Sequence, residues 1–279
     1  MVRADISKAF VVLLTLFMVV AHGHAKRRDG YDILFILFKH SLFNLRGTRP
    51  TSGSNDFDVL IFTQHWPQTV CYTWKEKSPM HDCALPGNEE WSIHGIWPTK
   101  YHVIGPLYCN SSLPFDMTAL QPLESELEVK WIDVMKGTKH HSFWTHEWEK
   151  HGTCAAVLEP LNSEYNYFKK GLTLFDEYDM KHTLAQANIT PGRKYTAQTI
   201  LDGVAKVLGK KCQIECIGTK DSYLFEIRIC FDKKLNLVDC DGIPGFPTNC
   251  GLKKEIVYPG SVPPMYSFFG FFLLIKAWP

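Results

Sequence analysis

The sequence carries almost no net charge and has no apolar run long enough for a comfortable membrane span. Its 30 lysines and arginines nearly balance 29 aspartates and glutamates, which leaves a formal net charge of +1. A protein that coats nucleic acid through a broad basic surface needs a much larger positive excess, so we exclude that class. Disorder is excluded as well, because 45% of the residues are hydrophobic and 13% are aromatic, enough to build a sizeable core.

Two apolar runs lie near the chain ends, and each is shorter than the ~20 residues that cross a bilayer as a helix. The first, from Ala9 to Val20, precedes a cluster of small residues, so residues 1–25 are expected to be a cleaved secretory signal. An uncleaved signal anchor is the alternative. The second run lies in an apolar C-terminal tail, residues 260–279, whose end is expected to dock as a final strand. A lipid-anchor signal is the alternative there.

The nine cysteines fit the secretory route that the signal segment predicts. In an oxidising compartment, cysteines indicate disulfides rather than metal ligation. Two N-glycosylation sequons, which begin at Asn110 and Asn188, are consistent with the same route.

The stretch FWTHEWEKHGTC, residues 143–154, places two imidazoles, a carboxylate and an ammonium, those of His146, His151, Glu147 and Lys150, within six positions. If residues 143–151 form an α-helix, Glu147 and His151 share one face, and His146 and Lys150 share another face about 100° away. This convergence suits proton transfer beside a developing negative charge.

A second histidine after the His146–Glu147 pair raises the alternative of a zinc metalloprotease. A zinc helix places its two histidines four residues apart, so that both imidazoles face one ion. Here His146 and His151 are five residues apart, which corresponds to about 140° around an α-helix. On that spacing we reject the protease and expect no metal and no other cofactor.

The segment SIHGIWPT, residues 92–99, offers a partner for this cluster. His94 lies at an expected strand end, and Gly95 after it lets another segment or a ligand approach closely. Trp97 provides a flat surface on which a nucleic acid base can stack, with core packing as the alternative. Two histidines from separate segments both titrate near neutral pH, so they can serve as general acid and general base in one reaction.

The pair IHGIWP and FWTHEWEKHGTC resembles the two active-site segments of the ribonuclease T2 family, the acid, transferase-type endoribonucleases. FTQHWP, residues 62–67, resembles the N-terminal core strand of that family, and the resemblance spans residues 57–259. It implies cleavage of single-stranded RNA through its own 2′-hydroxyl, giving 2′,3′-cyclic phosphates without a metal. DNA lacks the 2′-hydroxyl and is not expected to be a substrate.

The resemblance also assigns roles to individual residues. His151 is the implied general base and His94 the implied general acid. His146 would hold the phosphate, and Lys150 and Glu147 would stabilise the transition state.

Substrate contacts are implied at fewer positions. Trp97 would stack on one base, and Gln64 and His65 would line a second base site, with ordinary strand packing as the alternative. Thr99 stands where the family often has an aspartate that helps to read the base, so the base preference stays open.

The animal branch of the family implies four disulfides and leaves Cys212 over, although Cys212 and Cys216 could exchange roles. The implied pairs are Cys71–Cys83, Cys109–Cys154, Cys216–Cys250 and Cys230–Cys240. The second pair would tie the end of the histidine-rich helix to the loop after Trp97.

The apolar periodicity predicts strands first, helices in the middle and strands again at the end. This order indicates a single α+β domain, disulfide-stapled, with a central, largely antiparallel sheet flanked by helices. Leu123, Leu127, Trp131 and Val134 are expected to line one helix, and Tyr165, Phe168, Leu172 and Phe175 another. The predicted strands cover residues 58–64, 91–96, 223–231 and 235–239, and the predicted helices cover 122–135, 143–151, 163–178 and 196–208.

Residues 57–259 are therefore expected to form the catalytic domain, preceded by an extension of uncertain order at residues 26–56. Trp144 and Trp148 should pack the histidine-rich helix against the sheet, whereas His140 and His141 should be solvated loop residues. We expect a secreted or lysosomal monomer that binds RNA and does not insert stably into membranes. The alternative is a non-enzymatic secreted protein, for signalling or storage, on the same scaffold.

Overall fold

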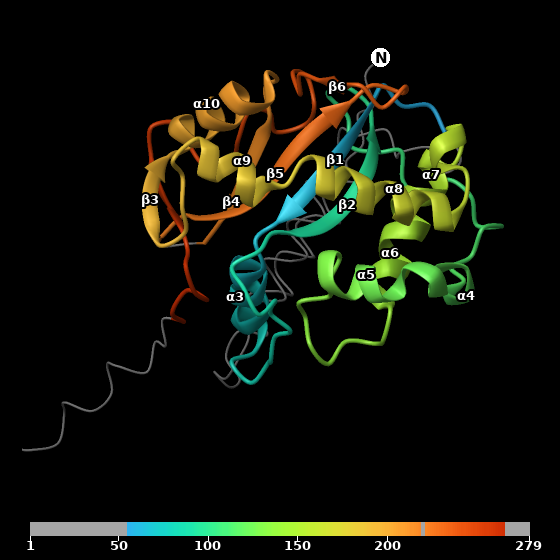
Figure 1. Cartoon of the computed structure of the whole chain (residues 1–279), viewed down its shortest axis with the longest axis horizontal. Coiled ribbons are helices and arrows are strands. Elements are labelled where there is room, and N and C mark those ends of the chain that lie inside the picture. Colours follow the sequence, from blue (N-terminus) through green and yellow to red (C-terminus); the bar gives the residue numbers. More distant parts are fainter. Residues whose placement is uncertain (1–54, 219–220, 266–279) are drawn as a thin grey trace, which may run out of the picture. The chain divides into compact units, whose positions relative to one another are not determined.

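A seven-stranded sheet forms the centre of the part of the chain that the computed structural model describes, residues 55–218 and 221–265. The signal segment, nearly all of the extension and the final apolar run lie outside these described residues. Strands β2, β1, β5, β7 and β3 follow one another in that order, and β4 and β6 also pair with β5 (Figure 1). The strands are β1 Val59–His65, β2 Ser92–Thr99, β3 Arg193–Thr196, β4 Gln213–Ile217, β5 Tyr223–Phe231, β6 Leu237–Val238 and β7 Glu255–Tyr258.

All strand pairs are antiparallel except β5 with β7, which meet at one parallel residue pair. The largely antiparallel α+β fold is therefore confirmed. Strand β1 pairs with β2 and β5 and contributes side chains to core clusters on both of its faces, so its first four residues are apolar. All seven residues of β1 are buried.

The helices lie mainly between β2 and β3 in sequence, and their ends carry recognisable caps. Ser163 accepts a hydrogen bond from the Asn166 amide at the start of α8, and Gly209 adopts a left-handed conformation that ends α10. The helical segments are α3 Pro67–Lys77, α4 Met117–Leu120, η2 Gln121–Leu123, α5 Glu124–Lys130, α6 Ser142–Glu147, η3 Trp148–Gly152, α7 Thr153–Ala155, η4 Glu159–Leu161, α8 Glu164–Glu177, α9 Met180–Gln186 and α10 Ala197–Leu208.

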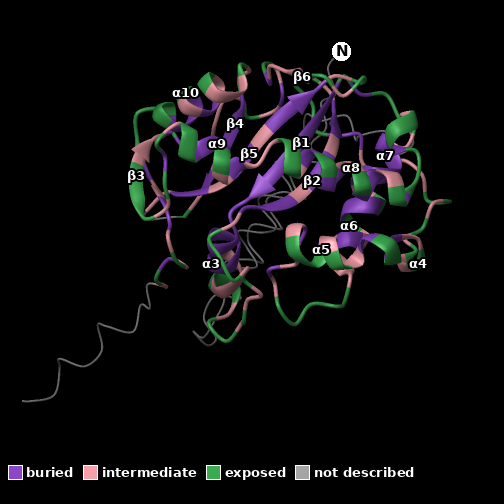
Figure 2. Ribbon diagram, in the orientation of Figure 1, coloured by how far each residue is buried: buried purple, intermediate pink, exposed green. Residues whose placement is uncertain are grey.

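The main core lies between the sheet and α8, where large aromatic side chains are fully enclosed (Figure 2). Tyr167 and Phe168 on α8 and Trp131 after α5 are each completely buried. The hydroxyl of Tyr167 accepts a hydrogen bond from the amide of Ile96 and donates one to its carbonyl, so α8 fixes the backbone of β2 directly.

Two predicted helices differ in detail from the structure. The helix expected over residues 122–135 ends at Lys130, because Trp131 leaves helical geometry to bury its indole. On α8 Tyr167 is buried beside the predicted core residue Phe168, whereas Tyr165, which was expected in the core stripe, is 38% exposed. The sequence pattern did not predict α3, α9 or β7.

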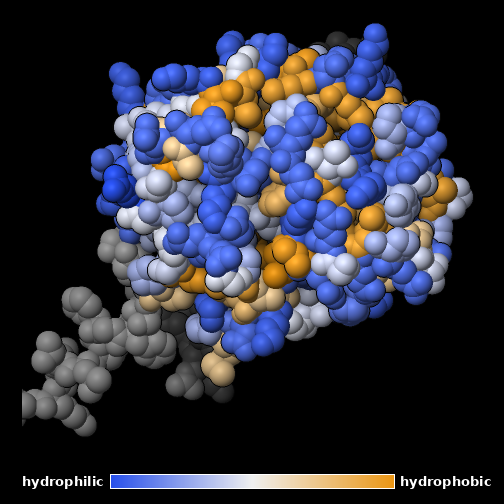
Figure 3. Space-filling model, viewed as in Figure 1, coloured by the Kyte–Doolittle hydropathy of each residue, from blue (hydrophilic) through white to orange (hydrophobic). Residues whose placement is uncertain are grey.

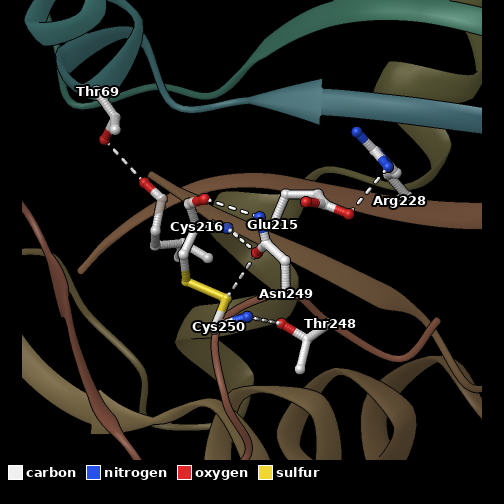
Figure 4. Close-up of a disulfide and its surroundings, with 8 residues drawn as sticks. Thr69, Glu215, Cys216, Arg228, Thr248, Asn249 and Cys250 are labelled. Carbon is white, nitrogen blue, oxygen red and sulfur yellow. Dashed lines mark hydrogen bonds and ion pairs between the residues drawn. A yellow bond between two sulfur atoms is a disulfide. The ribbon is translucent and has the colours of Figure 1, made fainter. Parts of the chain in front are cut away.

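All four disulfides implied by the family resemblance are present. Cys212 is buried and unbridged, so it does not exchange roles with Cys216. Figure 4 shows Cys216 joined to Cys250, with the Asn249 side chain bonded to both the amide and the carbonyl of Cys216. This link ties β4 to the segment that leads into β7.

In the face seen in Figure 3, hydrophilic side chains cover most of the area and apolar ones form scattered clusters. Within the described part of the chain, no helix combines the length and the apolar character needed to cross a bilayer. The sequon residue Asn188 is exposed and Asn110 is partly exposed, and glycosylation at either position stays a prediction.

Candidate active site

His94 is the extra residue of a bulge in β2. Thr63 on β1 pairs with Gly95, but the next residue, Gln64, pairs with Ile93, so His94 is left without a partner in the ladder. A bulge of this kind re-aims a side chain and is common beside active sites. The indole of Trp131 donates a hydrogen bond to the carbonyl of His94, 3.0 Å away, and this bond stabilises the bulge.

The sequence predicts one regular α-helix over residues 143–151, but the structure differs there. Helix α6 ends at Glu147 and continues into a π-helical turn, Trp148–Gly152. A π turn brings residues five apart onto one face. His146 and His151 therefore approach each other, with ring centroids 6.4 Å apart. Trp144 and Trp148 are buried as predicted, and their indoles donate to backbone carbonyls.

The bulge and the π turn meet at one cavity of about 320 Å³, here called the histidine cavity. Its lining includes all five residues to which the resemblance gave chemical roles, together with the predicted base contact. They are His94, His146, Glu147, Lys150, His151 and Trp97. The two segments that sequence reasoning paired are thus brought together in space. The Cys109–Cys154 disulfide and a hydrogen bond from the Tyr108 amide to the Lys150 carbonyl hold the π turn to the neighbouring loop.

Glu147 is the most enclosed charged group of the cavity, with 1% of its side chain exposed. Its Oε2 accepts a 2.8 Å hydrogen bond from the Trp97 indole, and its Oε1 lies 3.9 Å from Nε2 of His94. Burial raises the pKa of Glu147 to about 7, although His94 and the Trp97 hydrogen bond act in the opposite direction. The carboxyl group therefore binds a proton at mildly acidic pH.

The implied acid and base, His94 and His151, line the same cavity and have oppositely displaced pKa values. Burial lowers the pKa of His94, but the carboxylates of Glu226 and Glu147 outweigh burial, so its pKa is raised overall. Burial lowers the pKa of His151 well below its usual value, and the positive charge of Lys150 lowers it further. His94 thus favours the protonated form and His151 the neutral form.

Trp97 is held by contacts on several sides. Besides its bond to Glu147, its ring lies 5.2 Å from the His151 ring and 5.3 Å from the guanidinium carbon of Arg228. Thr99, buried in the cavity wall, donates its hydroxyl to the Trp97 carbonyl. Base stacking on Trp97 stays a prediction.

A second cavity of about 240 Å³ lies on the other side of His94 and His146, and its lining includes His65 and Phe143. We call it the His65 cavity. Burial, with the nearby positive charge of His94, lowers the pKa of His65 to about 3. A neutral imidazole therefore lines this space, where a base contact of His65 stays a prediction.

Gln64 does not belong to either cavity. Its amide nitrogen donates to the Tyr178 carbonyl, 2.7 Å away, and its carbonyl oxygen accepts from the Met180 amide, 3.4 Å away. The side chain is 1% exposed and serves to join β1 to the α8–α9 connection. The predicted substrate contact of Gln64 is therefore wrong, and strand packing is the correct alternative.

His141 also differs from its prediction as a solvated residue. Its ring stacks on Trp144 at 5.1 Å and an interplanar angle of 12°. The backbone of His141 is left-handed, with φ 60°, at the start of α6. His140 is exposed, as expected.

Sequence reasoning missed Glu226 and Arg228 on β5. Oε1 of Glu226 lies 2.5 Å from Nδ1 of His94, and Arg228 holds the other carboxylate oxygen. A signal was present, because FEIRI places two opposite charges two residues apart, on one face of an otherwise apolar strand. A buried strand face rarely carries charge without a partner.

The five-residue spacing of His146 and His151 does not by itself exclude a metal site. Because of the π turn, ligand atoms of His146, Glu147 and His151 lie within 4.8 Å of one another, although the histidines are five apart. The set nevertheless fits a cation poorly, since the Lys150 ammonium lies 3.4 Å from Nε2 of His146. A metal ion there would face that positive charge.

The described geometry agrees with comparisons to known proteins. The ribonuclease T2 family profile matches residues 57–240. The chain belongs to the ribonuclease T2 family. It is 36% identical to ribonuclease Oy of the oyster Magallana gigas over 212 residues, which cover 73% of this chain and 97% of the relative. Membership of this family of endoribonucleases replaces the metalloprotease alternative.

Solved structures of the ribonuclease T2 family superimpose on the fold. Human ribonuclease T2 aligns with a TM-score of 0.59 and 31% identity, over 73% of this chain and 98% of that one. A mutant of ribonuclease MC1 in complex with 5′-UMP aligns with a TM-score of 0.62 and 30% identity, over 73% of this chain and 99% of that one.

Proposed function

We propose that this ribonuclease T2 family member cleaves single-stranded RNA by transfer of the phosphate to the neighbouring 2′-hydroxyl, without a metal ion. The products are a 2′,3′-cyclic phosphate and a free 5′-hydroxyl. The observation that carries the proposal is the opposite displacement of the pKa values of His94 and His151 in one cavity. Two groups whose environments push their pKa values apart are suited to act as acid and base.

The proton transfers follow from these two states. Neutral His151 takes the proton of the 2′-hydroxyl, and the 2′-oxygen attacks phosphorus. The bond from phosphorus to the 5′-oxygen breaks, and Nε2 of protonated His94 delivers a proton to that oxygen. RNA supplies the nucleophile itself, so the reaction as proposed requires no metal-bound water, and DNA cannot undergo it.

The remaining groups of the histidine cavity stabilise the negatively charged phosphorane. Lys150 supplies a fixed positive charge, and His146 beside it contacts a phosphate oxygen. Glu147 has a pKa near 7, so it is neutral at pH 5 and does not repel the phosphate. Among the residues that the structure describes, its Oε1 has no hydrogen-bond partner, and it can donate to a phosphate oxygen when protonated.

The bases on either side of the scissile phosphate have separate places to bind. Trp97 lines the histidine cavity, and His65 and Phe143 line the His65 cavity on the other side of His94. The complex of the related ribonuclease MC1 mutant with 5′-UMP supports nucleotide binding on this scaffold. Thr99 carries no carboxylate to read a base edge, so the base preference is left open.

A secreted or lysosomal monomer fits the predicted signal at residues 1–25 and the four disulfides. Sequencing the N-terminus of the protein released from expressing cells tests the route. An N-terminus upstream of residue 21 would contradict cleavage of the signal. Light scattering of the same material tests the monomeric state.

The activity is tested on the purified protein with total RNA at pH 5, in the presence of a chelator and with single-stranded DNA as the control substrate. We expect cleavage of RNA only, with 2′,3′-cyclic phosphate ends detected by mass spectrometry. His94→Ala and His151→Ala should each lose on the order of 10²–10⁴-fold in rate. His140→Ala, at an exposed position outside both cavities, is the matched control.

Three outcomes would contradict the proposal. Near-normal rates in either histidine variant would remove the assigned acid and base. Loss of wild-type activity on chelation would contradict metal independence. An inactive but folded wild-type protein would favour the alternative of a non-enzymatic secreted protein on the same scaffold.

A further inference from the structure

The imidazole of His94 is engaged through both nitrogen atoms, one on each side of the ring. Nε2 faces the histidine cavity, 3.9 Å from Oε1 of Glu147. Nδ1 lies 2.5 Å from Oε1 of Glu226. The ring is 26% exposed, whereas the Glu226 side chain is 1% exposed. The contact on Nδ1 is thus shielded from solvent and lies away from the reacting side of the ring.

Glu226 is itself held in a fixed orientation. Its second oxygen, Oε2, accepts hydrogen bonds from Nε and Nη2 of Arg228, at 3.1 and 2.7 Å. Arg228 is anchored in turn through Nη1, which donates to Glu215 at 3.1 Å and to Gln213 at 3.2 Å. Figure 4 shows the pair of Arg228 and Glu215 beside β5. A carboxylate with both oxygens engaged cannot rotate away from His94.

The strand register makes this contact a property of the fold. β1 lies between β2 and β5, and Glu226 on β5 is the ladder partner of His65 on β1. The bulge in β2 turns His94 toward this charged residue two strands away. Its contact with Glu226 therefore depends on the bulge and on the pairing of all three strands.

We propose that Glu226 is a positioning residue that holds His94 as an imidazolium, with its Nε2–H directed into the histidine cavity, and that Arg228 keeps Glu226 in place. The proposal rests on the general-acid role assigned to His94 above. A carboxylate bonded to Nδ1 fixes both the orientation and the protonation site of an imidazole. A general acid must carry its proton before the leaving oxygen departs, so Glu226 acts on the rate without touching the substrate.

The charges around His94 support this assignment. Burial lowers the pKa of His94, and the positive charge of Arg228 lowers it further. The carboxylate of Glu226 raises this pKa most, and that of Glu147 on α6 raises it as well. His65 on β1, His146 on α6 and the π-turn residues Lys150 and His151 also lie around it. The pKa of Glu226 is lowered to about 2, because His94 and Arg228 outweigh its burial. Glu226 is therefore ionised over the whole range in which His94 titrates.

The decisive experiment compares the pH dependence of kcat/KM in the wild type, Glu226→Gln and the control Glu215→Gln. Glu215 also contacts Arg228 but not His94, so its variant disturbs the anchor without removing the charge on Nδ1. In Glu226→Gln we expect the alkaline limb of the kcat/KM profile to move down by at least about one pH unit, which lowers the rate about tenfold at pH values above the wild-type limb. At pH 4 the loss should be smaller than at pH 7. The limb should stay in place in Glu215→Gln.

A measurement without activity separates this proposal from the proposed function. The His94 ring is titrated by NMR in the same three proteins, and its midpoint should fall only in Glu226→Gln. An unchanged midpoint there would overturn the positioning role, even with the ribonuclease activity intact. If the protein cleaves no RNA but the midpoint falls, the contact stands and the catalytic assignment fails.

The wild-type protein alone also tests the proposal, should Glu226→Gln not fold. The proton on Nδ1 of His94 should exchange slowly with solvent at pH 6 and give a low-field NMR resonance. Detection of that resonance supports the contact. A His94 ring with no proton on Nδ1 at that pH would overturn it.

Discussion

The Glu147 carboxylate occupies the space that a side chain at Gly95 would need. A Cβ built on Gly95 would lie 2.0 Å from Oε2 of Glu147 and 2.4 Å from the indole nitrogen of Trp97. No side chain fits there, because real Cβ atoms do not approach other heavy atoms so closely. The glycine after His94 thus lets the carboxylate of Glu147, at the end of α6, reach the strand that carries His94.

Gly95→Ala should therefore disable the active site. The added methyl group displaces the Glu147 carboxylate and breaks its bond to Trp97, and loss of one preorganised group costs about 10²–10³-fold in kcat. Steady-state assays on RNA at pH 5 measure the effect. Gly87→Ala is the matched control, since a Cβ at Gly87 meets nothing within 4 Å. Near-normal activity in Gly95→Ala would contradict the crowding.

Tyr167→Phe should destabilise the fold by about 1–3 kcal/mol, because it leaves the buried amide and carbonyl of Ile96 without their shared partner. Tyr195 offers a matched control, as its hydroxyl bridges the amide and carbonyl of Thr190 in the same way at an exposed site. Water replaces the hydroxyl there, so Tyr195→Phe should change the free energy of unfolding by less than about 0.5 kcal/mol. Urea unfolding at pH 7 measures both, and equal losses would contradict the argument.

His65 should make the protein sensitive to acid. Its folded pKa is about 3, below the unfolded value of 6.5, so only the unfolded state takes up the proton as the pH falls through this window. Stability is retained above pH 6.5 and declines toward pH 3. At pH 5 the loss from this residue is about 2 kcal/mol.

The test is the difference in the free energy of unfolding between pH 7 and pH 5. His65→Gln has no proton to take up, so this difference should shrink by about 2 kcal/mol relative to the wild type. The same change at the exposed His140 should leave the difference as it is. An unchanged difference in His65→Gln would show that the buried ring is not held neutral.

The sequence predicts the parts of the site that are close together along the chain. His94, Gly95 and Trp97 share one strand, and the residues from His146 to His151 share one helical segment, so local patterns find both. Runs of apolar and β-branched residues also locate β1 and β5, because these strands bury nearly every side chain.

The sequence does not predict the two local irregularities that aim the chemistry. The bulge at His94 depends on how β1 pairs with β2, and the π turn at Trp148–Gly152 depends on packing around it. A Cβ at Gly152 would lie 2.2 Å from the Trp148 ring, which shows how tightly that turn is packed. Regular helical spacing therefore placed His146 and His151 on different faces, although the fold brings them together.

Glu226 was missed for a different reason. It lies 132 residues after His94, and nothing local to either residue indicates the other. Contacts of that kind are set by strand order, here β2, β1 and β5. The same applies to Gln64, whose amide is taken up by the backbone of Tyr178 and Met180, although its strand neighbours made it look like a site residue.

Lys150→Gln should change the acid side of the pH profile as well as the overall rate. The ammonium helps to lower the pKa of His151 and of His146, after burial in both cases. Without it the pKa of His151 rises, so less of the base is neutral at low pH and the rate falls more at pH 4 than at pH 6. Loss of the positive charge beside the phosphate should add a fall of about 10²-fold at every pH.

The matched control for Lys150→Gln is Lys139→Gln, which removes the same charge from an exposed loop before α6. Profiles of kcat/KM from pH 3.5 to 8 on a dinucleotide substrate separate the two effects. A uniform fall with an unmoved acid limb would show that Lys150 acts on the phosphate alone. A shifted limb without a uniform fall would show that it acts only through the base. Both effects together are expected, because the ammonium lies 3.4 Å from Nε2 of His146 and lines the same cavity as His151.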